Sequence, residues 1–182
     1  MLKREITTHF LVAFVWLAIL TLLRWSWHWD LLWLWLGGLL GTYFFDLDHF
    51  LYLLVINPHE LTSQRFQRLW QQKRFKEALT LVAETTLERK RLPFHNALFQ
   101  IINFVLCFFV LSSSNNLFVA GMVMGMALHL LKDEIGELLG KQEERLRDWL
   151  FWQVKFEISL EGQRVYLIAM ILIFLLLNLF LI

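Results

Sequence analysis

Histidines and aspartates interrupt stretches of this sequence that are otherwise apolar. The residues concerned are His9, Asp46, Asp48, His49, His95, His129 and Asp133. A charged side chain at the centre of a membrane helix costs about 2.5 kcal/mol or more, so such residues are functional candidates. Imidazole and carboxylate are also ordinary ligands of zinc, iron and manganese. The residue types therefore indicate metal or proton chemistry.

The spacing of these residues indicates which of them can act together. His129 and Asp133 share one helix face at i, i+4, as do Asp46 and His49 at i, i+3. Asp46 and Asp48 cannot share a face of a continuous helix, because two residues turn about 200°. Either the helix breaks between them, or one acid binds a metal while the other orients a histidine from behind.

The composition places these residues in a membrane protein. Of 182 residues, 58% are hydrophobic and 18% are charged, against about 45–50% and about 25% in ordinary soluble domains. This excludes a disordered chain, a nucleic-acid-binding tail and a disulfide-stapled module, for which the single Cys107 is also insufficient. We expect no nucleic-acid partner and one compact unit in contact with membrane lipids.

We expect an all-α integral membrane protein, with residues 1–182 forming a single membrane domain. About five transmembrane helices are predicted near 10–23, 31–56, 97–111, 117–131 and 165–182. Two further segments, 64–88 and 142–156, combine basic side chains with apolar ones near helical spacing. We interpret them as amphipathic helices at the cytoplasmic interface. Either their charged faces bind anionic headgroups, or the helices cover a functional site.

The distribution of basic residues sets the orientation. Sixteen of the seventeen Lys and Arg residues fall within 1–9, 57–96 and 132–164, and Arg24 is the exception. The positive-inside rule then places the N-terminus in the cytoplasm. Counted from the outer ends of their spans, His9, Asp46, His95 and His129 all lie about 20–28 Å deep. Antiparallel spans therefore bring them to one layer at the cytoplasmic face.

Four short elements resemble a known family. They are Thr8-His9, Phe45-Asp46-Leu47-Asp48-His49, Lys90-Arg-Leu-Pro-Phe-His95 and Leu128-His129-Leu-Leu-Lys-Asp133. In this order, over roughly residues 7–133, they resemble the membrane-bound metal-dependent hydrolases, the YdjM-type proteins of the bacterial inner membrane. Phe45 stands where that family has Pro, and Lys90 stands where it has the first His of its third element. One metal ion, or a non-catalytic site, stays open.

The resemblance implies a hydrolase acting on phosphoesters, because that family is similar in its His and Asp spacing to zinc phospholipase C and P1-type nucleases. We predict one or two divalent metal ions, most simply zinc, held by His9, Asp46, His49, His95, His129 and Asp133. Asp48 or Glu134 is the predicted general base, and Arg91 with Lys90 is predicted to hold a phosphate. A membrane location favours a phospholipid or lipid-linked phosphoester as substrate.

Other functions stay open at this point. The polar layer could be structural or hold a non-catalytic metal, or the amphipathic segments could dock a partner protein as in a scaffold. A transport conduit is less favoured, because the outer halves of the first two spans offer only Thr21, Thr42 and Tyr43 as polar groups. His28 and His59 lie outside the layer, and we interpret them as an interfacial and a loop residue.

Overall fold

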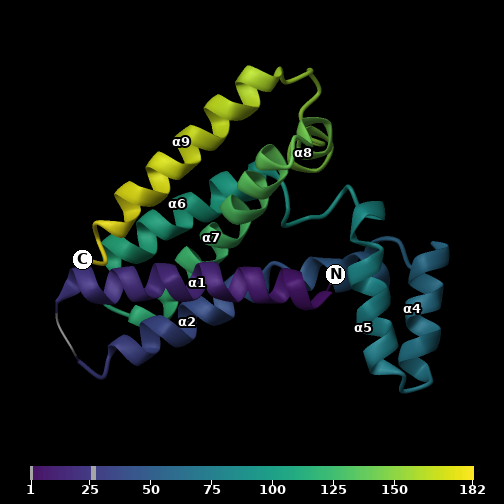
Figure 1. Cartoon of the computed structure of the whole chain (residues 1–182), viewed down its shortest axis with the longest axis horizontal. Coiled ribbons are helices and arrows are strands. Elements are labelled where there is room, and N and C mark those ends of the chain that lie inside the picture. The colour runs from purple at the N-terminus through teal and green to yellow at the C-terminus, as the bar shows by residue number, and fades with distance from the viewer. Residues whose placement is uncertain (1, 26–27) are drawn as a thin grey trace.

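The computed structural model describes residues 2–25 and 28–182. Within these residues the regular secondary structure is entirely helical (Figure 1). The elements are α1 (Leu2–Arg24), α2 (Leu31–Phe44), α3 (Leu47–Leu51), the π-helix η1 (Tyr52–Ile56), α4 (Leu61–Gln71), α5 (Phe75–Glu84), the 3₁₀-helix η2 (Thr86–Glu88), α6 (Ala97–Ser113), α7 (Leu117–Leu139), α8 (Glu143–Leu150) and α9 (Leu160–Asn178).

Three stretches of the described chain are long and apolar enough to cross a membrane. They are Ile6–Arg24, Leu31–Ile56 and Leu160–Asn178, and α6 is a shorter apolar helix. Their outward faces carry large exposed apolar side chains such as Leu22 and Val165. Helices satisfy their backbone polar groups internally, which hydrocarbon requires. These features indicate membrane association, as the composition predicted.

Glycines set the closest helix contact in the fold. A Cβ atom at Gly125 of α7 would lie 3.0 Å from the carbonyl carbon of Gly38 in α2, and one at Gly41 would lie 2.9 Å from the Cα of Met122. The backbones of α2 and α7 therefore touch directly, as small residues allow in membrane helix pairs. Thr42 lies beside this contact, and its carbonyl group reaches α7.

Asparagine and serine side chains begin three of the helices. The side chain of Asn96 accepts a hydrogen bond from the backbone N–H of Phe99, and that of Asn116 accepts from the N–H groups of Phe118 and Val119. Ser159 caps α9 in the same way. Each cap satisfies donors that the first turn of a helix leaves free. The cap at Asn96 thus fixes the start of α6 at Ala97, two residues after His95.

The predicted span 31–56 consists of three helical pieces rather than one straight helix. It breaks at Phe45 and Asp46, where the N–H of Asp48 donates to the carbonyl of Phe45 and that of His49 to the carbonyl of Asp46. Phe45 is fully buried against Met126 and Leu130 of α7. Phe45 and Asp46 keep helical dihedral angles, so the two hydrogen bonds tighten the turn between α2 and α3.

The predicted amphipathic segment 64–88 is a helical hairpin, α4 and α5, which Figure 1 shows to one side of the long helices. Lys73 takes a left-handed conformation (φ 59°) at the turn, and the N–H of Arg74 donates to the carbonyl of Leu69. The turn lets Phe66 of α4 pack with Ala78 of α5. A single helix would leave these apolar faces unpaired.

The segment predicted at 142–156 is helical only over α8, Glu143–Leu150. Phe151 directly after it is buried and contacts the ring of Tyr166 at 5.1 Å between centroids. Burial of this aromatic residue ends the helix earlier than its charge pattern suggested.

Candidate metal centre

The six predicted ligands lie together in the structure. Four separate segments supply them. His9 lies in α1, Asp46 lies at the break before α3, and His49 lies in α3. His95 lies in the segment before α6, and α7 holds His129 and Asp133. We name these six residues the His/Asp cluster. Its members come from positions up to 124 residues apart, so tertiary packing must bring the four segments together.

Several side chains direct coordinating atoms at one point. Nε2 of His129 lies 3.1 Å from Nε2 of His95 and 3.2 Å from Oδ2 of Asp133. Nε2 of His9 lies 3.1 Å from the other oxygen of Asp133, and its ring stacks on that of His129 at 4.3 Å between centroids. Asp46 approaches more loosely, with Oδ1 at 3.8 Å from Nε2 of His129.

Hydrogen bonds behind the rings fix two of the histidines. Nδ1 of His95 lies 2.8 Å from Oδ2 of Asp48, and Nδ1 of His129 lies 2.6 Å from the carbonyl oxygen of Thr42. Because both partners only accept, each Nδ1 carries a proton and donates it. Each neutral ring then presents a bare Nε2 lone pair to the cluster. Such outer partners are the usual support of metal-bound histidines.

Charge in the cluster favours a cation at its centre. The two Nε2 lone pairs of His95 and His129 face one another at 3.1 Å, an arrangement that requires a proton or a metal ion between them. Burial lowers the pKa of His95, but the nearby carboxylates, above all Asp48, outweigh it and hold the pKa above its usual range. The site therefore attracts positive charge.

The donor set fits a divalent metal. Two ligands on a tetrahedral zinc ion, each about 2.0–2.1 Å from it, lie roughly 3.3 Å apart. Three separations in the cluster come close to this value: 3.1 Å between His95 and His129, 3.1 Å between His9 and Asp133, and 3.2 Å between His129 and Asp133. Two groups of three meet the wider criterion for a shared ion, His9 with His129 and Asp133, and Asp46 with His49 and His95.

The cluster is open at its carboxylates. The side chains of His9, His95 and His129 are each less than a tenth exposed, whereas those of Asp133 and Asp46 are 25% and 43% exposed. Lys132 lies at the same edge, and its ammonium group contacts Asp133 at 2.9 Å. Any solute that reaches the cluster meets these acids first.

The two residues predicted as general base, Asp48 and Glu134, are both fully buried. Asp48 is fully buried behind His95, where its Oδ2 also accepts from the backbone N–H groups of Phe94 and His95. This placement agrees with the alternative that one of the two acids orients a histidine, and it leaves Asp48 without the solvent contact that a general base for an incoming substrate needs. Glu134 is fully buried as well, on the side of Gln100 and away from the exposed carboxylates. A residue without solvent contact is poorly placed to serve an incoming substrate.

Both residues predicted to hold a phosphate lie at the surface. Arg91 is exposed, and Lys90 forms an exposed ion pair with Asp148 at 2.8 Å. The arginine that reaches the cluster is Arg89, which our sequence reasoning missed. Its Nε donates to Nδ1 of His49 at 3.1 Å. The only sequence signal for Arg89 was its position two residues before Arg91. A basic residue in that loop is equally typical of a solvated surface charge.

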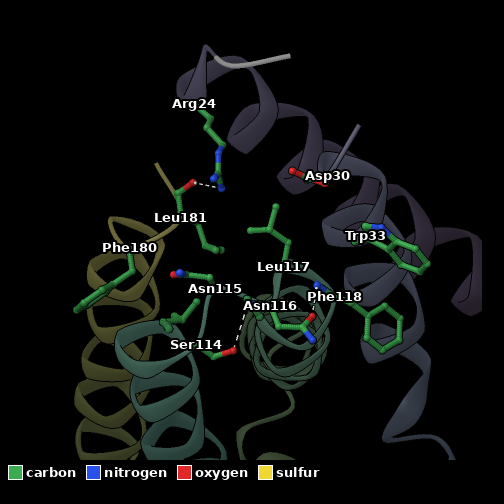
Figure 2. Close-up of a pocket in the computed structure, with 12 residues that line it drawn as sticks. Arg24, Asp30, Trp33, Ser114, Asn115, Asn116, Leu117, Phe118, Phe180 and Leu181 are labelled. Carbon is green, nitrogen blue, oxygen red and sulfur yellow. Dashed lines mark hydrogen bonds between the residues drawn. The ribbon is translucent and has the colours of Figure 1, made fainter. Parts of the chain in front are cut away.

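A cleft of about 700 Å³ lies at the opposite end of the long helices (Figure 2). The close-up shows Arg24, Asp30 and Asn115 around it, together with the chain end at Leu181. Arg24 donates to the carbonyl of Leu181 at 3.3 Å. This cleft holds none of the cluster residues, so its size does not bear on their chemistry.

Comparisons with known proteins add nothing to this geometry. No family model matches the chain, and neither the curated proteins nor the solved structures gave a match. The resemblance to the membrane-bound metal-dependent hydrolases therefore rests on the four short motifs alone.

Proposed function

We propose that this protein is a membrane-embedded, metal-dependent hydrolase with its site at the cytoplasmic face of a bacterial inner membrane. The observation that carries the proposal is the convergence of bare Nε2 atoms and a carboxylate, with Asp48 and the Thr42 carbonyl holding the opposite ring nitrogens. Burying ionisable side chains in a membrane protein costs free energy, so such residues are usually functional.

The proposed ligands are His9, His95, His129 and Asp133, holding one or two divalent ions, most simply zinc. When bound, such an ion supplies Lewis acidity that polarises an ester and lowers the pKa of water. Asp48 keeps the His95 ring in the tautomer that leaves Nε2 free. We assign the role of general base to Asp46, because it is the most exposed carboxylate of the cluster and lies 3.8 Å from His129.

A five-span topology with a cytoplasmic N-terminus agrees with the arrangement of the helix ends. The chain segments around Arg24, Asn115 and Leu181 meet at the cleft in Figure 2, as three outer ends would. Trp16 donates to Asn178 at 2.7 Å, so α1 and α9 run with their C-terminal halves together. The cluster and the basic hairpin α4–α5 then share the cytoplasmic side, where α4, α5 and α8 are proposed to lie at the interface.

The proposed substrate is a phosphoester that is a phospholipid or is linked to one. Two features support it: the four-motif resemblance, and the position of the exposed acids at the proposed membrane face. Arg91 is exposed on the loop that delivers His95 and remains the proposed contact for a phosphate.

A structural metal site is the second candidate function. The near-complete burial of His9, His95 and His129 favours it, because structural sites are closed while catalytic ones keep an open position. The two candidates differ in the expected effect of Asp46, which a structural site does not need.

The test is hydrolysis of bis(p-nitrophenyl) phosphate and of short-chain phospholipid by detergent-purified, zinc-loaded protein. We expect Asp46→Asn to keep its metal and to lose about 10²–10⁴-fold in turnover, as for removal of a general base. His59→Ala, which changes an exposed histidine outside the cluster, is the matched control. Absence of turnover in wild type with metal bound would leave the structural site as the correct function.

A further inference from the structure

His49 differs from His95 and His129 in what faces its Nδ1 atom, while Nδ1 of His9 lies 3.4 Å from the ammonium group of Lys132. Nε of Arg89 points at this nitrogen, at 3.1 Å. A guanidinium group has only N–H donors and stays protonated, so Nδ1 of His49 must accept. The neutral His49 ring therefore carries its proton on Nε2. His95 and His129 show the reverse pattern, because their Nδ1 atoms donate to Asp48 and to the Thr42 carbonyl.

Arg89 is held so that it cannot turn away from His49. It is 4% exposed. Its Nη1 donates to the hydroxyl of Thr85 at 2.9 Å, and its Nη2 donates to the carbonyl of Val82. These contacts tie the guanidinium to the end of α5. The tautomer of His49 is thus set by a buried, permanently charged donor, as second-shell partners commonly set histidine tautomers.

The remaining nitrogen of His49 belongs to the cluster. One ring nitrogen of His49 lies within 4.8 Å of a ring nitrogen of His95 and of a carboxylate oxygen of Asp46. Because Arg89 occupies Nδ1, we assign this nitrogen as Nε2. An N–H group cannot ligate a metal, since a ligating imidazole nitrogen needs its lone pair. At this place it can only donate.

We propose that His49 is the hydrogen-bond donor of the site, directed at an anionic oxygen of the substrate, and that Arg89 is the positioning residue that keeps the proton on Nε2. This replaces the ligand role predicted for His49 from sequence. It rests on the proposed function, because it takes the neighbouring His95 and Asp46 as parts of a working site. A phosphoryl oxygen is the acceptor that such a donor suits best.

The experiment compares His49→Leu with His49→Gln, whose amide N–H₂ can take the place of Nε2–H. The readouts are zinc content and the affinity of the zinc-loaded protein for inorganic phosphate, measured by calorimetry. We expect both variants to keep the zinc content of wild type. His49→Leu should weaken phosphate binding about 10- to 100-fold, as for loss of one hydrogen bond to a charged group. His49→Gln should stay within about threefold of wild type.

Loss of zinc from His49→Leu would show that His49 is a ligand and overturn the proposal. Unchanged phosphate affinity in that variant, or no phosphate binding by zinc-loaded wild type, would overturn it as well. ¹⁵N NMR of histidine-labelled, metal-free protein separates this inference from the proposed function. We expect the His49 ring protonated at Nε2, and a ring protonated at Nδ1 would contradict the Arg89 contact even if the protein binds no zinc.

Discussion

The Gly125→Ala substitution provides a sensitive test of how the contact between α2 and α7 supports the proposed metal centre. The added Cβ would lie 3.0 Å from the carbonyl carbon and 3.1 Å from the Cα of Gly38, and nearer still to the Gly38 oxygen. Carbon atoms prefer separations of about 3.5–4.0 Å, so α2 and α7 must move apart by about 0.5–1 Å.

This movement would reach His129 through Thr42. The 2.6 Å contact from Nδ1 of His129 to the Thr42 carbonyl would lengthen to about 3.1–3.6 Å, at or past the limit of a hydrogen bond. Loss of such an outer partner typically lowers metal affinity about 10–100-fold. Overpacking should also reduce the free energy of unfolding by about 1–3 kcal/mol.

The assay is a zinc competition titration on folded protein, with folding checked by near-UV circular dichroism. Gly136→Ala is the matched control on the same helix, because a Cβ there meets nothing within 4 Å. We expect this control to bind zinc within about twofold of wild type and to be up to about 1 kcal/mol more stable, from helix propensity. A folded Gly125→Ala protein with the zinc affinity of Gly136→Ala would refute the reasoning.

Three further outcomes follow from the site. Asp48→Asn removes the carboxylate behind His95, and zinc affinity should fall about 10–100-fold in the same titration while the saturating zinc content stays unchanged; equal affinity would contradict the positioning role. The raised pKa of His95 means that its proton persists to higher pH. Because zinc must displace this one proton, zinc affinity should fall about tenfold for each pH unit below that pKa. A zinc affinity that does not change from pH 6 to 8 would be inconsistent with His95 as a ligand. Lys90→Ala breaks an exposed ion pair with Asp148, and thermal denaturation should show a change below about 1 kcal/mol; a larger loss would show that Lys90 stabilises more than this pair.

Residue type and hydropathy were sufficient to predict membrane association and to single out the cluster residues. His9, His95 and His129 each lie near one end of an apolar segment, so position along a helix could be counted from the sequence. Three long apolar stretches in the structure agree with that membrane character. The five-span topology remains a prediction.

The sequence left open which acid orients a histidine, and only tertiary contacts place Asp48 behind the His95 ring. Asp48 is bonded to the backbone of Phe94 and His95, which lie 46 and 47 residues away. The spacing of Asp46 and Asp48 allowed a helix break as one alternative, but the burial of Phe45 against α7 is visible only in the folded chain. Glu134 is one residue from Asp133, but the 100° turn of the helix directs it to Gln100 instead.

Arg89 and the hairpin escaped prediction for a related reason. Basic residues near a membrane face are usually solvated, and only burial distinguishes Arg89 from Arg91. The turn at Lys73 requires a left-handed conformation that lysine adopts rarely. It is stabilised by the packing of Phe66 on α5, which is visible only once the two helices are paired.

The most direct test of the central claim is the metal content of the purified protein by elemental analysis. The comparison is between wild type, His129→Ala and the control His59→Ala. We predict at least one equivalent of a divalent metal, most simply zinc, in wild type and His59→Ala, and a loss of most of it in folded His129→Ala. Metal-free wild type that takes up no zinc, or full metal content in His129→Ala, would contradict the assignment of the His/Asp cluster as a metal centre.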